Sequence, residues 1–250
     1  MKLSFDPVAL TAFALALVRA SVFVFIAPPF NAKSIPTTVK LGVAATLALA
    51  AAPHIHTANL LDDTGAFVGA MVIQALVGLV MGLTVMLLLT AVQSAGSLID
   101  VFAGFSIAAI YDPFSDASVS LFGRFYQLLA TTLIFATNGH MLIAKGFFTS
   151  FEIFPVGQYD PASIAHALTL NLAQLFVAAL EIAGPVVACL FLSELTMGLV
   201  ARAAPALNVF SLAFPVRVGV TLLVVASAVP LLAPAINNLL NLGVRSFLGG

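Results

Sequence analysis

Charged residues are scarce in this sequence. Lysine and arginine together number 9, aspartate and glutamate 10, so that 8% of the 250 residues carry a charge and the formal net charge is −1. Soluble domains usually contain about 25% charged residues. With 62% hydrophobic residues and a mean hydropathy of +1.15, the chain cannot cover a water-soluble surface. We therefore predict an all-α integral membrane protein, and the lack of a basic run argues against nucleic-acid binding.

The sequence motifs that usually carry catalysis are also missing. The chain has no tryptophan and one cysteine, Cys189, which we interpret as an inert thiol in an apolar run. It contains no phosphate-binding loop, no H-E-x-x-H zinc motif and no G-x-S-x-G nucleophile turn. The histidines lack a cysteine cluster that would complete a metal site; they are His54, His56, His140 and His166. We expect no catalytic residue, no metal and no cofactor, and hence no enzyme.

Hydrophobic segments dominate what is present. There are about six of them: Val8–Phe30, Leu41–Pro53, Ala66–Val92, Val119–Ala144, Ile164–Val200 and Ala206–Ile236. A membrane-spanning helix needs about 20 apolar residues, so a simple count gives about six crossings. Leu41–Pro53 is short enough for a half-helix, whereas Ile164–Val200, with Pro185 inside, is long enough to kink or to break in two. We expect Val8–Phe30 to be a retained helix and the Lys33/Lys40 side to be cytoplasmic.

Four charged residues interrupt the apolar segments: Arg19, Glu181, Glu194 and Arg217. A charge at the centre of a membrane helix costs about 2.5–3.5 kcal/mol on insertion scales, so such groups face protein or water and often pair. They are either an ion path or structural pairs that fix helix register, within this chain or with a partner. Gly78-x-x-x-Gly82 adds a flat surface on which helices can pack closely.

The stretch DVFAGFSIAAIYDPFSD, residues 100–116, breaks the apolar pattern with three carboxylates, a glycine and a proline. Gly104 relieves helix geometry, and Asp112-Pro113 enforces a non-helical turn because the residue before proline disfavours the α region. From these residues alone the stretch predicts an ordinary connecting loop exposed to water.

Three stretches together resemble the FliR family of flagellar export-apparatus proteins, which has counterparts in virulence type III secretion. They are PPFNAKSIPTTVKLGVAATLALA at 28–50, LIDVFAGFSIAAIYDP at 98–113 with ATNGH at 136–140, and RAAPALNVFSLAFPVRVGV at 202–220. The resemblance implies a non-enzymatic subunit of bent and broken helical hairpins, with a FliP-like portion near 1–165 and a FliQ-like portion near 166–250.

The resemblance also implies partners and a place. One copy of the chain would join several copies of FliP and FliQ in an export gate, with FlhB and FlhA around it. The gate would lie in the bacterial inner membrane at the flagellar basal body, in contact with lipid, and would pass unfolded export substrates. A loop of this subunit would plug the lumen. The matching residues here are Phe105, Ile107, Ile110, Tyr111, Asp112 and Pro113.

Two other functions fit the residues less well. One is the equivalent subunit of a virulence injectisome. The other is a self-contained multi-pass transporter, which buried charges and proline-broken helices also suggest. Two features argue against the transporter: the charges are few, and the sequence has no matched pair of broken segments of the kind that marks inverted repeats.

Overall fold

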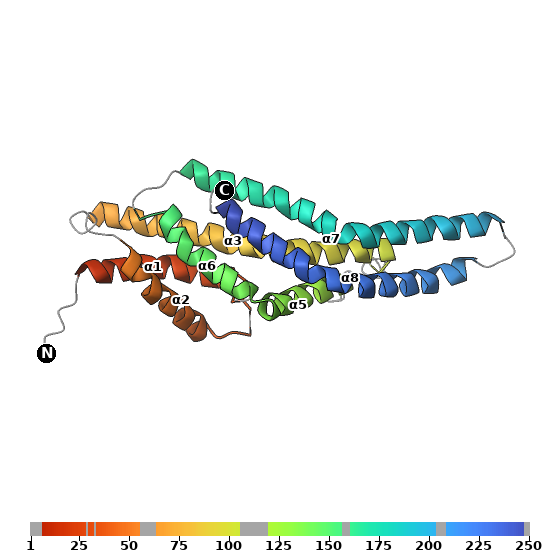
Figure 1. Cartoon of the computed structure of the whole chain (residues 1–250), viewed down its shortest axis with the longest axis horizontal. Helices are drawn as coiled ribbons and strands as arrows, with labels where there is room; N and C mark the ends of the chain where they lie inside the picture. The colour runs from red at the N-terminus through yellow and green to blue at the C-terminus, as the bar shows by residue number, and fades with distance from the viewer. Residues whose placement is uncertain are drawn as a thin grey trace, which may run out of the picture. The chain divides into compact units, whose positions relative to one another are not determined.

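A computed structural model describes residues 7–28, 30–32, 34–55, 64–105, 120–156, 161–203 and 209–247, and these form helices and connecting turns (Figure 1). The elements in chain order are α1 (Pro7–Ile26), α2 (Thr37–Ala51), the short 3-10 helix η1 (Ala52–His54), α3 (Thr64–Ala103), α5 (Leu121–Ala136), α6 (Gly139–Ile153), α7 (Pro161–Ala203) and α8 (Val209–Phe247). The all-α prediction is confirmed.

Four helices in the described ranges are long and apolar enough to cross a membrane, or five if α5 and α6 count as one broken span. Their apolar parts are Pro7–Ile26, Thr64–Ala103, Phe176–Ala203 and Ala213–Gly243. Helix α2 has 15 residues and so measures about 22 Å, less than the roughly 30 Å of a hydrocarbon core. The expectation of about six crossings therefore exceeds what these helices offer.

The expectations about helix breaks need correction at two points. Of the two alternatives for the segment 164–200, a kink or a break in two, the break is wrong, because α7 continues through Pro185 as one helix of 43 residues. The segment 119–144, taken as one apolar stretch, is instead divided between α5 and α6. Asn138, with φ 58°, adopts the left-handed conformation that an asparagine tolerates better than most side chains and that ends regular helix.

The chain divides into two compact units. Unit 1 holds Met1–Leu88, Asn138–Ala173 and Leu240–Gly250, and unit 2 holds Leu89–Thr137 and Gln174–Leu239. Helices α3, α7 and α8 each contribute residues to both units. The predicted portions 1–165 and 166–250 follow a different criterion, likeness to other subunits, and stay a prediction.

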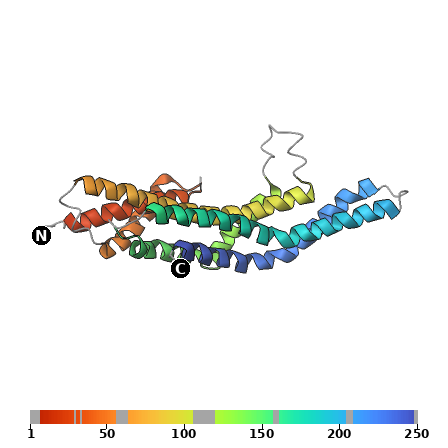
Figure 2. The same cartoon turned by 90° about the horizontal axis from the view of Figure 1, so that it is seen from above.

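In unit 1, α1 lies beside the first part of α3 in both views (Figures 1 and 2). Helix α2 buries only alanines, Ala44, Ala48 and Ala51, so that it can pack closely on α1. Phe23 and Phe147 are buried and in ring contact, with centroids 5.4 Å apart. Aromatic burial thus joins α1 to α6.

In unit 2, the described side chains of α7 and α8 bury few large residues and expose many. The buried ones are Val186, Leu190, Val225, Leu232, Ile236 and Leu239, whereas the exposed ones include Phe176, Leu180, Phe191, Leu192, Leu195, Leu199, Leu222, Leu223 and Leu231. A water-soluble surface does not present apolar side chains at this density. This surface is made for lipid or for other protein.

Candidate functional site

The described residues that flank the segment 106–119 on its two sides meet in a group that we call the neck: Gly96, Asp100, Phe105, Ser120, Phe122 and Gly123. The carboxylate of Asp100, near the end of α3, accepts hydrogen bonds from the Ser120 hydroxyl and from the Phe122 amide, the latter at 3.0 Å. Asp100 is 3% exposed, so water does not compete for its oxygens. The end of α3 is thereby joined to the start of α5.

Local sequence explains why both helices end at the neck. Gly104, with φ 82°, donates its amide to Val101 O, and the Phe105 amide bonds Asp100 O at 3.0 Å, which is the Schellman pattern of helix termination. Ser120 caps α5 by accepting the Gly123 amide at 2.8 Å. Each helix end is thus satisfied before the two are joined.

Glycine permits the close approach at the neck. A Cβ at Gly96 would lie 2.4 Å from Phe122 O, and one at Gly123 would lie 2.7 Å from Ser97 Oγ. The ring of Phe105 also contacts Phe122, with centroids 5.8 Å apart, and Phe214 of α8 at 6.4 Å. Backbone contact, ring contact and hydrogen bonds coincide here.

Of the predicted plug residues, Phe105 belongs to the neck. The other five, Ile107, Ile110, Tyr111, Asp112 and Pro113, lie outside the described residues. Their role in a plug stays a prediction.

Arg19 forms a second polar cluster, inside unit 1. Its side chain is fully buried and donates from Nε to Gln74 Oε1 at 2.7 Å, from Nη1 to Ser150 Oγ at 2.9 Å and from Nη2 to Phe154 O at 2.8 Å. The guanidinium carbon also lies 3.8 Å from the ring centroid of Phe151. Because Phe154 is the C-cap of α6, the negative end of that helix dipole faces the cation. Arg19 therefore joins α1, α3 and α6.

The predicted packing glycines bring α3 to Arg19. A Cβ at Gly78 would lie 2.5 Å from Arg19 O, and one at Gly82 would lie 2.8 Å from Cβ of Ile26. Gln74 precedes Gly78 by one helical turn and shares its face, so close backbone approach carries the Gln74 amide to the guanidinium. Gly78 contacts Arg19 and Gly82 contacts Ile26, so residue numbers increase in the same direction along both helices and α1 and α3 run parallel.

The remaining predicted charges lie on α7 and α8. Arg217 and Glu194 form an ion pair whose side chains are 28% and 55% exposed. Glu181 is exposed on α7 and lies 13 positions before Glu194. The chain itself therefore pairs Arg217 with Glu194, and both glutamates are exposed on α7; whether a partner subunit covers them stays a prediction.

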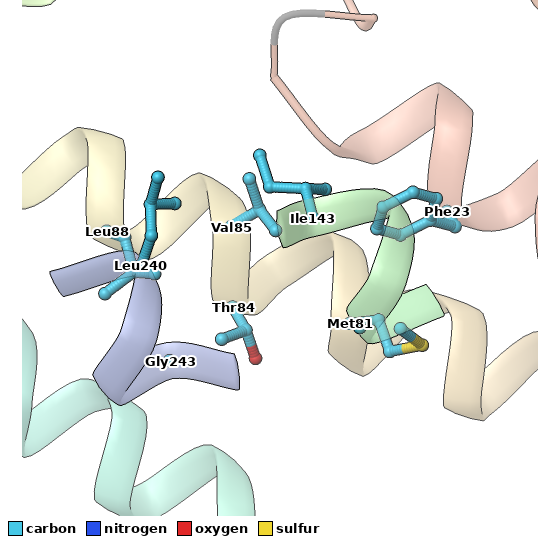
Figure 3. A pocket seen from close by; sticks show the side chains of 9 residues that line it. Phe23, Met81, Thr84, Val85, Leu88, Ile143, Leu240 and Gly243 are labelled. Atoms are coloured by element: carbon cyan, nitrogen blue, oxygen red, sulfur yellow. The ribbon is translucent and has the colours of Figure 1, made fainter. Parts of the chain in front are cut away.

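Unit 1 also contains a cavity of about 30 Å³ among α1, α3, α6 and α8 (Figure 3). Its walls are apolar apart from Thr84, whose hydroxyl bonds Val80 O at 2.9 Å. An apolar space of this size stays dry and is too small for a substrate. Within the described ranges, no group of three or more His, Cys, Asp or Glu side chains comes together that could hold a metal.

Sequence reasoning missed the partners of the charged groups: Gln74, Ser150 and Ser120. Gln74 is the lone amide in a long apolar run, which is the same signal that singled out Arg19. Ser120 directly precedes an apolar helix, the usual position of an N-cap. Asp100 had been noticed as a carboxylate in the apolar sequence but not assigned to a site.

Comparison with known proteins places this architecture. The family model described as bacterial export proteins, family 1, matches residues 10–243. The flagellar biosynthetic protein FliR of Bacillus subtilis is 31% identical over 239 residues, covering 94% of this chain and 92% of the relative. FliR of Escherichia coli K12 is 30% identical, covering 89% and 86%. The Yop proteins translocation protein T of Yersinia pestis is 27% identical, covering 58% and 56%.

Proposed function

This chain belongs to family 1 of the bacterial export proteins, and we propose that it is a non-enzymatic subunit of a flagellar type III protein export gate. The observation that carries the proposal is the match to flagellar FliR proteins over nearly the whole chain. The gate would pass unfolded substrates across the bacterial inner membrane. The proposed partners are FliP and FliQ within the gate, and FlhB and FlhA around it.

The surface of α7 and α8 supports assembly with other subunits. In their most apolar stretches, 28% and 22% of the residues are buried within the chain, against 56% for α3. The ion pair Arg217–Glu194 lies on these same helices, and lipid is a poor solvent for a partly exposed pair. Protein neighbours would cover both the apolar side chains and the pair.

We further propose that the segment beginning at Phe105 plugs the gate. Ile107, Ile110 and Tyr111 would exclude water from a narrow pore and thereby block ions, and Asp112-Pro113 would turn the chain. Deleting residues 107–111 should make membranes that carry the gate leak ions. An assembled gate that still holds ions after the deletion would remove the basis for this role.

The test of the gate proposal is isolation of the tagged chain from its native membrane in mild detergent, followed by native mass spectrometry. We expect a defined complex with one copy of this chain and several copies of two other small membrane proteins. The test variant is the charge reversal Glu194→Arg on α7, and its matched control is the reversal Glu152→Arg at an exposed position of α6. Reversal at 194 should reduce recovery of the partners more than reversal at 152.

A chain that purifies alone, monodisperse and folded, would contradict the gate proposal and favour a self-contained transporter. Such a chain should also move a small solute in liposomes without other subunits. A gate subunit, in contrast, should show no transport by itself.

The second candidate function is the same role in a virulence secretion system, favoured by the match to the Yersinia translocation protein. Expression in a strain lacking its own FliR distinguishes the two. Restored motility supports the flagellar role, whereas failure there together with restored secretion in a strain lacking the Yop translocation protein T supports the other.

A further inference from the structure

We propose that Asp100 is a positioning residue of the gate: by joining the end of α3 to the start of α5, it fixes the base from which the segment 106–119 extends. The inference rests on the proposed plug function. It concerns the neck, whose residues the structure describes.

Asp100 makes the polar contacts that cross between the two helices. Its carboxylate lies on α3 and both of its donors, the Ser120 hydroxyl and the Phe122 amide, belong to the start of α5. Hydrogen bonds to a charged acceptor are roughly twice as strong as neutral ones, and burial strengthens them further. The buried carboxylate is the strongest link between the two ends of the segment.

Asp100 does more than cap a helix. Ser120 already performs that task by accepting the Gly123 amide. Asp100 accepts a hydrogen bond from the Ser120 hydroxyl and so joins the capping residue itself to α3. A cap needed only for the stability of α5 would require no carboxylate from another helix.

The remaining neck contacts bring the helices together without locking them. Gly96 allows Phe122 O to approach α3, and the rings of Phe105 and Phe122 meet at 5.8 Å. Such contacts are weakly directional, whereas two hydrogen bonds to one carboxylate fix both distance and rotation. Loss of the carboxylate should leave the helices adjacent but their register loose.

A loose base should weaken a plug, because functional groups must be held within about 0.5 Å by the elements that support them. Removing a hydrogen bond to a charged group should raise the population of an open neck about tenfold. Ion leakage through the assembled gate should rise by a similar factor. Assembly itself, which depends on other surfaces, should persist.

The experiment uses the whole complex in liposomes loaded with a small fluorescent dye. The test variant carries Asp100→Cys and Ser120→Cys in a Cys189→Ser background, so that a disulfide can replace the native contact reversibly. Dye efflux is measured with dithiothreitol and again after oxidised glutathione. Matched references are Cys189→Ser alone under both conditions, Asp100→Asn, and the deletion of residues 107–111.

The proposal expects about tenfold faster efflux from the reduced double variant and a return toward the reference on oxidation. Asp100→Asn should lie between the two, because a single amide oxygen in the place of Oδ2 can still accept both donors, but hydrogen bonds to a neutral acceptor are about half as strong as those to a carboxylate.

Other outcomes overturn the proposal in distinguishable ways. If the deletion leaks while both redox states of the double variant hold dye, the plug stands and the role of Asp100 falls. If the deletion itself holds dye, the plug falls and the positioning role falls with it. Complexes that fail to assemble with Asp100→Asn and with the reduced pair would make Asp100 a folding residue.

Discussion

The two arginines that interrupt apolar helices, Arg19 and Arg217, are accommodated in opposite ways. Arg19 is fully buried among neutral acceptors and an aromatic ring, all within unit 1. Arg217 is partly exposed and bonds the more exposed carboxylate of Glu194. One cation is satisfied inside the fold, and the other lies on a surface that protein or water must complete.

The difference follows from what surrounds each charge. Around Arg19, glycine brings α3 close enough for the Gln74 side chain to reach the guanidinium, and the end of α6 supplies a carbonyl. Around Arg217, large apolar side chains such as Phe214 and Val216 are exposed. A buried cation therefore determines how unit 1 packs, whereas the exposed pair is available for recognition between subunits.

The strongest test of this comparison is Arg19→Leu. The change removes the donor from two buried acceptors, Gln74 Oε1 and Ser150 Oγ, and from the part-buried Phe154 O. A buried group left unpaired costs about 1–3 kcal/mol, so we expect a loss of roughly 2–6 kcal/mol in the stability of the chain. The measurement is the fraction of purified complex that survives heating, followed by size-exclusion chromatography.

The control for Arg19→Leu is Arg202→Leu, which removes the same group from an exposed position at the end of α7. It should leave heat resistance nearly unchanged. Equal losses from both variants would mean that the buried cluster contributes nothing special.

A smaller effect is expected from Gly78→Ala. The new methyl group would meet the backbone of Arg19 at 2.5 Å, and backbone cannot rotate away. Overpacking of this kind costs about 1–3 kcal/mol, and it would also move Gln74 from the guanidinium. The same heating assay, combined with Gln74→Ala in a double-mutant cycle, should reveal coupling between the two positions.

Gly69→Ala is the matched control for Gly78→Ala on the same helix, because a Cβ there meets no atom within 4 Å. Alanine favours helix over glycine by about 1 kcal/mol, so Gly69→Ala should be neutral or stabilising. A loss at Gly69 as large as at Gly78 would refute close packing as the reason for glycine at 78.

The sequence predicted which residues need polar partners but not which residues those partners are. Long apolar runs predict helices, and Arg19 in such a run predicts a polar neighbour. Gln74 and Ser150 lie 55 and 131 positions away, and only packing brings them together. The division between α5 and α6 is encoded locally, since Asn138-Gly139 is a turn signal. A prediction based on hydrophobicity alone missed it, because the segment 119–144 is apolar on both sides of the turn.

For the candidate site, the sequence predicted the importance of the segment that follows Gly104 but not the neck contacts on either side of it. The plug prediction placed importance on residues after Gly104, while the described contacts involve Asp100, Ser120 and Phe122 at its ends. A carboxylate and a serine 20 residues apart have no pattern that links them in sequence. Their link depends on glycines that let α3 and α5 touch.

The smallest effect on the folded chain is expected from neutralising the exposed pair with Glu194→Gln. Exposed ion pairs contribute about 0–1 kcal/mol, so heat resistance of the chain should change little.

The charge reversal Glu194→Arg should instead reduce recovery of partner subunits, because two cations would face the same neighbour. Adding Arg217→Glu to that reversal restores opposite charges within the pair but exchanges their places. Recovery regained by the double variant would assign the pair to the fold of α7 and α8. Recovery that stays low would mean that a partner reads which helix carries which sign, as the contrast with Arg19 predicts.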